Sequence, residues 1–373
     1  MITTKSRRID LSGFSISIFS LAFGLFMGAI LIIIADRDPI LGYYTMVESS
    51  LSTPQRIGEM VIKITPFALA GLGIAIGFKG GYWNIGAEGQ IIIGALSALG
   101  LGYFINLPQP LHVTVIMIVG LITGGGWSLI SGILKAKLGV NEVLTTLMLN
   151  YVAVWLSEYF IVGPWSIAIT GETPVFARTV AILDSAKFPK IFPGTRAHLG
   201  VIMAMLLPFV IYYLLHRTAL GFKIRAVGEN PRAARIAGIN VSKMILTTSF
   251  MSGALAGLAG VSEVLGVHFF LERGFVEGYG YTSIAVATLG GLHPIGTLLS
   301  AIFFGFLING ASYMQRGINI PATTVQVFIG LLILSMLMAP IFKKYIIRLV
   351  MKEKRTKEIR IEQSGKNGLS IHN

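Results

Sequence analysis

Long apolar runs separated by short polar breaks cover most of the chain. Runs of about 20 residues suit transmembrane helices, and shorter ones need tight packing or a partner. We expect Asp36 and the residues that follow it, up to Glu59, to form an external loop. The pattern predicts an all-α polytopic membrane protein with about ten transmembrane helices, at 14–35, 60–78, 91–105, 113–134, 142–162, 199–215, 244–267, 281–292, 295–314 and 323–342.

Composition supports a membrane protein. Only 13% of the 373 residues are charged and the mean hydropathy is +0.75, whereas soluble domains carry roughly 25% charged residues. The 44 glycines suit close helix packing in lipid. The net charge of +13 suggests lysines and arginines on cytoplasmic loops, and no basic stretch carries the interleaved aromatics of a nucleic-acid binder.

The distribution of basic residues predicts the orientation. Most lysines and arginines fall before the first run, in the loop 217–243 and in the tail 343–373. Cytoplasmic loops carry such an excess, so we expect both termini inside and the loop 163–198 outside. The first run is too long for a cleaved signal peptide. A transmembrane domain over 1–342 and a basic cytoplasmic tail over 343–373 follow.

Enzymatic signatures are largely missing. The sequence has no Walker A pattern, no cysteine, no paired-histidine ligand spacing and no nucleophile elbow. We therefore expect no catalytic residue, no metal site and no cofactor bound by this chain. An intramembrane enzyme stays as a minor alternative.

A polar, basic island interrupts the apolar pattern at 219–238. Asn230 is a good N-cap, Pro231 suits the first helical position and Gly238 suits the left-handed residue that ends a helix. Arg232 and Arg235 are three residues apart and share one face. This short capped helix is built to dock on another protein, unless its arginines only set the topology.

A second polar break carries Asn84, Glu88 and Gln90 among glycines. Irregular backbone between two spans needs protein or water to satisfy it. This break lines a solute pathway or is simply a glycine-rich inner loop. Its Gly-Gly-x-x-x-Ile-Gly pattern at 80–86 recurs at 290–296, either as a repeat that marks a transport site or by chance.

Polar residues also lie inside two spans. Glu142, Thr146 and Asn150 are spaced four apart and form one stripe along a helix. Polar groups in lipid are costly, so the stripe faces other helices or water. It lines a pathway or hydrogen-bonds between helices. Glu263, with His268 at the outer end of the same span, has the same two interpretations.

The order of residues in these segments resembles a known family. Gly-x-x-x-Arg-Ala-Val-Gly-x-Asn-Pro-x-Ala-Ala-x-x-Ala-Gly-Ile at 221–239 is similar to the coupling loop of bacterial ABC importer permeases of the sugar, nucleoside and branched-chain amino acid type. Asn-Ile-Gly-Ala-Glu-Gly-Gln at 84–90, the run at 141–151 and the segments 260–268, 278–280 and 284–287 resemble the same family, the last three its nucleoside and simple-sugar branch.

The resemblance implies an ABC importer permease fold in the bacterial plasma membrane. The implied partners are ABC ATPase subunits that bind ATP and Mg²⁺, a second permease subunit as a homodimer or heterodimer, and an external substrate-binding protein. ATPase coupling falls on Gly221, Arg225, Gly228, Glu229, Asn230, Pro231, Arg232, Ala233, Arg235 and Gly238. The substrate pathway falls on Asn84, Glu88, Gln90, Glu142, Thr146, Asn150, Glu263 and His268.

The expected function is passage of a small polar solute, with nucleosides first and simple sugars next. An ion-coupled secondary transporter is the alternative, in which Glu88, Glu142 and Glu263 hold protons or cations. A membrane scaffold or receptor without transport is disfavoured by the polar residues inside several spans.

Overall fold

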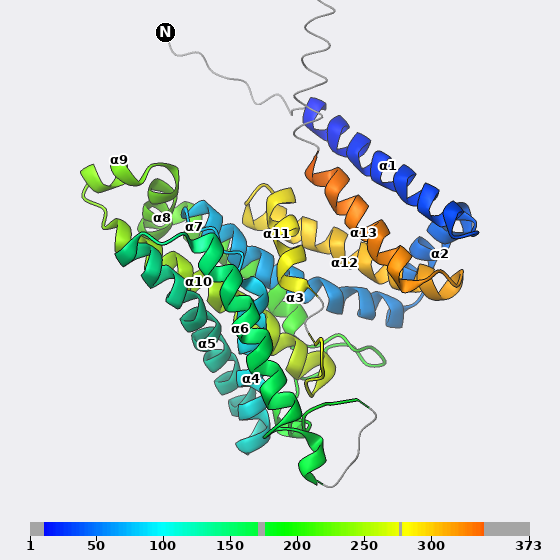
Figure 1. Ribbon diagram of the computed structural model, residues 1–373, viewed down its shortest axis with the longest axis horizontal. Coiled ribbons are helices and arrows are strands. Elements are labelled where there is room, and N and C mark those ends of the chain that lie inside the picture. Colours follow the sequence, from blue (N-terminus) through cyan, green and yellow to red (C-terminus); the bar gives the residue numbers. More distant parts are fainter. Residues whose placement is uncertain (1–10, 171–175, 276–277, 339–373) are drawn as a thin grey trace, which may run out of the picture. The chain divides into compact units, whose positions relative to one another are not determined.

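The computed structural model describes residues 11–170, 176–275 and 278–338 (Figure 1). The expected N-terminal charges, the end of the tenth run and the basic tail lie outside these ranges. The chain divides into two compact units, one made of 1–42 and 318–373 and the other of 43–317. The two units are described separately.

The smaller unit contains two apolar helices that pack together, α1 (Leu11–Ile34) and α13 (Ala322–Leu337). Gly24 of α1 lies against α13, and a Cβ atom built on it would come within 2.3 Å of the Ser335 hydroxyl oxygen. The small residue therefore lets the two helices approach closely. α2 (Pro39–Leu51) connects this unit to the larger one.

The larger unit is all-helical over its described residues, with only isolated bridges between extended segments. Its helices are α3 (Pro54–Lys79), α4 (Ala87–Phe104), α5 (Gln109–Leu138), α6 (Glu142–Val162), α7 (Leu199–Arg217), α8 (Ala219–Glu229), α9 (Pro231–Ile236), α10 (Val241–Glu263), α11 (Tyr279–Leu289) and α12 (Pro294–Gly317). Short 3₁₀ turns lie at Ile167–Thr170 and Asp184–Ala186, and a π-helical turn at Val264–His268 follows α10.

Local sequence explains several helix ends. The Thr53 side chain caps the start of α3 and the Asn141 side chain caps the start of α6. Gly139 ends α5 in the left-handed region at φ 67°. The predicted run 142–162 therefore coincides with α6, whose N-cap is Asn141 and whose C-cap residue is Gly163.

The core lies around α3, which packs against α10, α12, α11 and α7. Beside it, glycines allow α10 to cross α4 and α5 with almost no gap. A Cβ on Gly94 of α4 would be 2.1 Å from the Gly257 carbonyl oxygen, and one on Gly124 of α5 would be 2.6 Å from the Gly257 Cα. The glycine-rich composition thus serves helix packing, as expected.

Three expectations about the elements are wrong. The segment 36–59, expected as a loop, contains α2 and the first turn of α3. α4 begins at Ala87, so Glu88 and Gln90 lie in a helix and not in the break. The basic island holds two helices, because Thr218 caps an additional helix, α8, before α9 begins.

In the described part of the chain, seven helices are long and apolar enough to cross a membrane, or eight if the bent pair of α1 and α2 is one span. The count of about ten is therefore not confirmed. α11 has 11 residues and α13 has 16 within the described range. At about 1.5 Å per residue, α11 spans about 16 Å, roughly half of an apolar bilayer core.

The repeated glycine pattern forms the same turn twice. Gly80, Gly81 and Tyr82 donate to the carbonyls of Ile76, Phe78 and Gly77 and end α3, with Gly81 at φ 73°. At the end of α11, Gly290, Gly291 and Leu292 donate to the corresponding carbonyls of Val286, Thr288 and Ala287, with Gly291 at φ 64°. Both copies stop a helix abruptly, with a left-handed glycine at the second position.

Candidate functional site

The break between α3 and α4 lies inside the bundle and needs hydrogen-bond partners. Tyr82 and Asn84 are fully buried, and the Tyr82 hydroxyl donates to the Ser128 carbonyl on α5 at 3.2 Å. The Asn84 side-chain oxygen accepts from the Gly86 amide at 2.9 Å. Backbone amides in the break do not belong to a helix and so lack the regular hydrogen bonds of one. Side chains from neighbouring helices must therefore accept hydrogen bonds from them.

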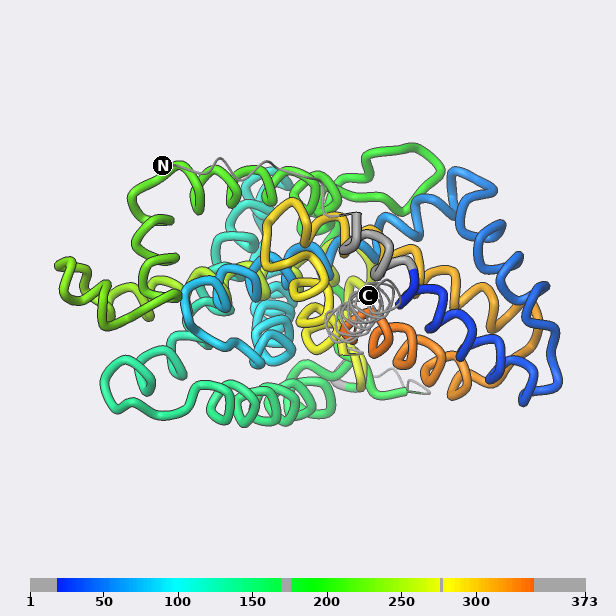
Figure 2. The backbone as a smooth tube through the Cα atoms, turned by 90° about the horizontal axis from the view of Figure 1, so that it is seen from above, coloured from blue at the N-terminus to red at the C-terminus, as the bar shows by residue number. Residues whose placement is uncertain are grey.

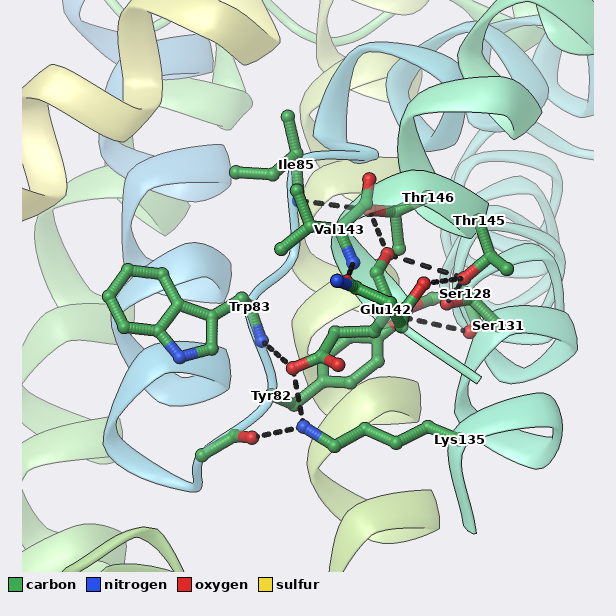
Figure 3. A network of polar contacts seen from close by, with 12 residues as sticks. Tyr82, Trp83, Ile85, Ser128, Ser131, Lys135, Glu142, Val143, Thr145 and Thr146 are labelled. Carbon is green, nitrogen blue, oxygen red and sulfur yellow. Dashed lines mark hydrogen bonds and ion pairs between the residues drawn. The ribbon is translucent and has the colours of Figure 1, made fainter. Parts of the chain in front are cut away.

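The polar stripe of α6 supplies those partners. Glu142 accepts from the Trp83 amide at 3.3 Å, and the Thr146 hydroxyl accepts from the Ile85 amide at 3.2 Å (Figure 3). The four-residue spacing brings each side chain to the break in turn.

Asn150 makes the deepest connection of the stripe. Its side-chain oxygen accepts from the Gly89 amide at 2.9 Å, and its NH₂ group donates to the Ile85 carbonyl at 3.0 Å and to the Tyr281 hydroxyl at 3.2 Å. Asn150 therefore joins α6 to α4, to the break and to α11. The N-cap that explains Asn141 has no part in these bonds.

A buried lysine balances the charge of Glu142. Lys135, on the last turn of α5, forms an ion pair with Glu142 and donates to the Gly81 carbonyl at 2.5 Å (Figure 3). Both side chains are mostly buried, at 20% and 11% exposure. Removal of one partner would leave an uncompensated charge, which is costly at such a site. Sequence reasoning missed Lys135, although it lies seven residues before Glu142.

Asn84 and Gln90 form a reciprocal amide pair. The Asn84 NH₂ group donates to the Gln90 oxygen at 2.8 Å, and the Gln90 NH₂ group donates to the Asn84 oxygen at 2.9 Å. Asn84 also donates to the Ser252 hydroxyl on α10 at 2.9 Å. Both amides are buried. The pair closes the break as a rigid loop and fixes it to α10.

Glu88 holds the start of α11. One carboxylate oxygen accepts from the Gly278 amide at 2.9 Å and the other from the Gly280 amide at 2.6 Å. The first amides of a helix have no intrahelical partner and carry partial positive charge, so a carboxylate is favourable there. A Cβ on Gly280 would lie 2.2 Å from the Glu88 amide nitrogen, which explains the glycine.

Glu263 and His268 lie elsewhere, and the interactions found among the described residues do not link them to this network. A Glu263 carboxylate oxygen is 3.5 Å from the His268 Nε2 atom, across the π-helical turn. Such turns are frequent at functional sites. His198 also lies near Glu263, and the sequence analysis missed it. Its Nδ1 atom accepts from the Gly200 amide at the start of α7. Burial lowers the pKa of His198 to about 4, against the opposing effect of the Glu263 charge.

The segment expected to couple to an ATPase lies at one edge of the larger unit, after α7 (Figure 2). The Asn230 oxygen accepts from the amides of Arg232 and Ala233, both at 3.1 Å, and Gly238 ends the segment at φ 79°. The caps of this helix are confirmed. Arg232 and Arg235 are exposed, and in the described structure neither has an ion-pair partner.

α8 rests directly on the end of α3. A Cβ on Gly228 would come within 1.9 Å of the Lys79 carbonyl oxygen. The Arg225 guanidinium donates to the Leu215 carbonyl and ties α8 to α7. A groove of about 510 Å³ separates the outer faces of α8 and α9, and Phe222, Glu229 and Ala233 are among its lining residues. The break therefore lies between α6 on one side and α8 on the other.

This arrangement, a bundle of apolar helices with an internal polar break and an exposed capped helix pair, is that of a polytopic membrane protein. The model of the family described as the permease component of the branched-chain amino acid transport system matches residues 56–337. The chain belongs to this family, and it is a multi-pass membrane protein. No solved structure matches it.

Curated relatives extend over nearly the whole chain. The guanosine ABC transporter permease protein NupP of Bacillus subtilis is 33% identical over 93% of this chain and 98% of its own. The glucose ABC transporter permease protein TsgB13 of Haloferax volcanii is 30% identical over 86% of each chain. The nucleoside ABC transporter permease protein NupB of Lactococcus lactis is 32% identical over 84% of this chain and 87% of its own. These relatives are transport subunits rather than enzymes.

Proposed function

We propose that the chain is the permease subunit of an ATP-driven importer of nucleosides or simple sugars. Family membership supports the permease assignment, and the relatives named for guanosine, nucleosides and glucose support the solute class. These solutes share a ring, several hydroxyl groups and no net charge. A neutral solute also suits the network, because the carboxylates of Glu88 and Glu142 already have partners.

The close contact between α8 and the end of α3 supports the proposal that this segment couples to an ATPase. An ATPase subunit bound to the exposed arginines of α9 would move α8, and Gly228 leaves no gap in which that movement could be absorbed before it reaches Lys79. The break that follows α3 would move with it. ATP and Mg²⁺ would bind the partner ATPase, and this chain would supply only the coupling surface.

The pathway proposal assigns the polar network a supporting role. Asn84, Gln90, Glu142, Thr146 and Asn150 direct their polar atoms at the break and at one another. We therefore propose that they hold the wall of the solute pathway in place. Glu263 and His268 would lie at its external end, beside the segment 163–198 that receives the substrate-binding protein.

The assembly would contain a second permease subunit. Bacillus subtilis has two proteins named as guanosine permeases, NupP and NupQ, and both resemble this chain, at 33% and 28% identity. A heterodimer in the plasma membrane is the arrangement that we favour.

The proposed topology has about ten transmembrane helices with both termini inside. Because the chain has no cysteine, single cysteines at Ile236 and Phe192 can test it. An impermeant thiol reagent should label only the second in intact cells, and labelling of the first would contradict the topology.

The decisive experiment reconstitutes the complex in vesicles and measures ATP hydrolysis with and without solute. Arg232→Glu with Arg235→Glu should abolish solute-stimulated hydrolysis and release the ATPase during purification, while the permease still inserts. Lys190→Glu reverses an exposed charge in the external segment and is the matched control. Unchanged hydrolysis in the double variant would remove the coupling assignment. Uptake that survives ATP depletion and collapses with the ion gradient would favour the ion-coupled alternative.

A further inference from the structure

One face of α6 exposes a row of aromatic side chains. Tyr151, Trp155 and Tyr159 are four residues apart, and their exposures are 57%, 72% and 64%. Helical geometry places residues with this spacing on one face, each about 6 Å further along the axis. The opposite face of α6 carries the buried stripe that holds the break. The aromatic row is therefore the outer surface of the same helix that frames the network.

The row begins near the middle of the span, and its last member, Tyr159, lies three residues before Val162, the last residue of α6. Tyr151 is nine residues beyond Glu142, the first residue of α6, which corresponds to about 14 Å of helix, near the middle of an apolar bilayer core of about 30 Å. In the described structure, the Tyr151 and Tyr159 hydroxyls and the Trp155 indole nitrogen have no hydrogen-bond partner. A polar group directed into lipid near the middle of the bilayer is costly, so Tyr151 and Trp155 need a polar neighbour, whereas Tyr159 can reach the outer interface.

A polar site lies at the outer end of the row. Glu158 forms an ion pair with Arg273 at 2.7 Å, and the Arg273 side chain is 67% exposed. A groove of about 550 Å³ opens at the start of α6, about 14 Å of helix before Tyr151, and its lining residues include Trp83, Lys135 and Glu142. Charged groups at these positions indicate contact with water. The aromatic face thus lies between two hydrated regions and adjoins the outer one.

A fourth aromatic residue connects the row to the buried network. Tyr281 of α11 is 42% exposed, its hydroxyl accepts from Asn150, and it lies close enough to Tyr151 to interact electrostatically. Tyr281 therefore brings a hydrogen-bonded member of the network near Tyr151, the inner end of the row. A purely lipid-facing surface would not need this connection.

We propose that Tyr151, Trp155 and Tyr159 form an aromatic ladder on which the ring of the transported solute stacks. This proposal rests on the proposed function and adds a binding surface to it. Aromatic rings interact at centroid separations of about 4.5–7 Å, so a step of about 6 Å lets a ring reach the next side chain before it leaves the previous one. The hydroxyl and indole groups bond to the hydroxyl groups of a nucleoside or sugar.

The test measures uptake kinetics of the reconstituted complex with a purine nucleoside. Stacking on one aromatic residue is worth about 1–3 kcal/mol, so Trp155→Leu should raise KM about fivefold or more. Trp155→Phe keeps a ring and should raise KM less than about threefold. The matched control is Tyr213→Leu on α7, an aromatic residue that is 63% exposed and lies outside the row. It should leave KM unchanged.

Each other outcome has a distinct meaning. An unchanged KM in Trp155→Leu and Tyr159→Leu would overturn the ladder and identify a lipid-facing surface. Loss of the second permease from the purified Trp155→Leu complex would overturn it in favour of a subunit interface. Equal effects of Phe and Leu at Trp155 would also contradict stacking. Absence of ATP-dependent uptake of nucleosides and sugars by the unmodified complex would overturn the proposed function itself.

Discussion

Replacement of Asn150 by Leu tests whether the stripe of α6 holds the break. The two side chains have similar shapes, so the change removes hydrogen bonds with little change in packing. Three bonds are lost, to the Gly89 amide, the Ile85 carbonyl and the Tyr281 hydroxyl. The Gly89 amide lies in the first turn of α4 and gains no helical partner in exchange.

The magnitude follows from two estimates. Interhelical hydrogen bonds in membranes contribute about 0.6 kcal/mol each, so three give about 2 kcal/mol. An unsatisfied buried backbone group costs about 1–3 kcal/mol, so the two groups left behind, on Gly89 and Ile85, give about 2–6 kcal/mol. The two estimates describe the same loss, so we expect Asn150→Leu to lower the free energy of unfolding by about 2–6 kcal/mol. Uptake should fall while the ATPase stays bound.

The assay is reversible unfolding of the purified permease in mixed micelles, followed by tryptophan fluorescence. Ser157→Ala is the matched control on the same helix, because the Ser157 hydroxyl donates only to the Val154 carbonyl of its own turn. The control should differ from the unmodified protein by less than about 0.5 kcal/mol. A loss below that value for Asn150→Leu, with normal uptake, would refute the reasoning about the break.

Two further predictions follow from close packing and from burial. Gly228→Ala should abolish solute-stimulated ATP hydrolysis, because its Cβ would lie 1.9 Å from the Lys79 carbonyl oxygen, whereas Gly126→Ala on α5 has open space and should be tolerated. Normal stimulation in Gly228→Ala would remove the contact from the coupling route. His198 has a folded pKa of about 4, below its unfolded value of 6.5, so the unfolded state binds the extra proton between these values. Stability should fall by up to about 3 kcal/mol as the pH drops from 6.5 to 4, and a His198→Gln variant that kept the same slope would contradict this.

Local patterns in the sequence determined the elements that depend on near neighbours. Asn141 and Gly163 are the caps of α6. Asn230 and Pro231 start α9, and Gly238 follows its end. These effects are local because capping residues and left-handed residues act within one helical turn. Spacing also placed Glu142, Thr146 and Asn150 on one face. The family was identifiable for the same reason, since its motifs are contiguous.

Only the tertiary structure decided which partners these residues meet. Glu142 pairs with Lys135, Glu88 binds the start of α11, and Gly228 lies against Lys79, across up to 192 residues of chain in the case of Glu88 and Gly280. Periodicity shows that a polar side chain is turned inward, but the group that it satisfies belongs to another helix. The physical reason is that a buried polar group can be satisfied by any neighbour, and helix packing alone chooses that neighbour.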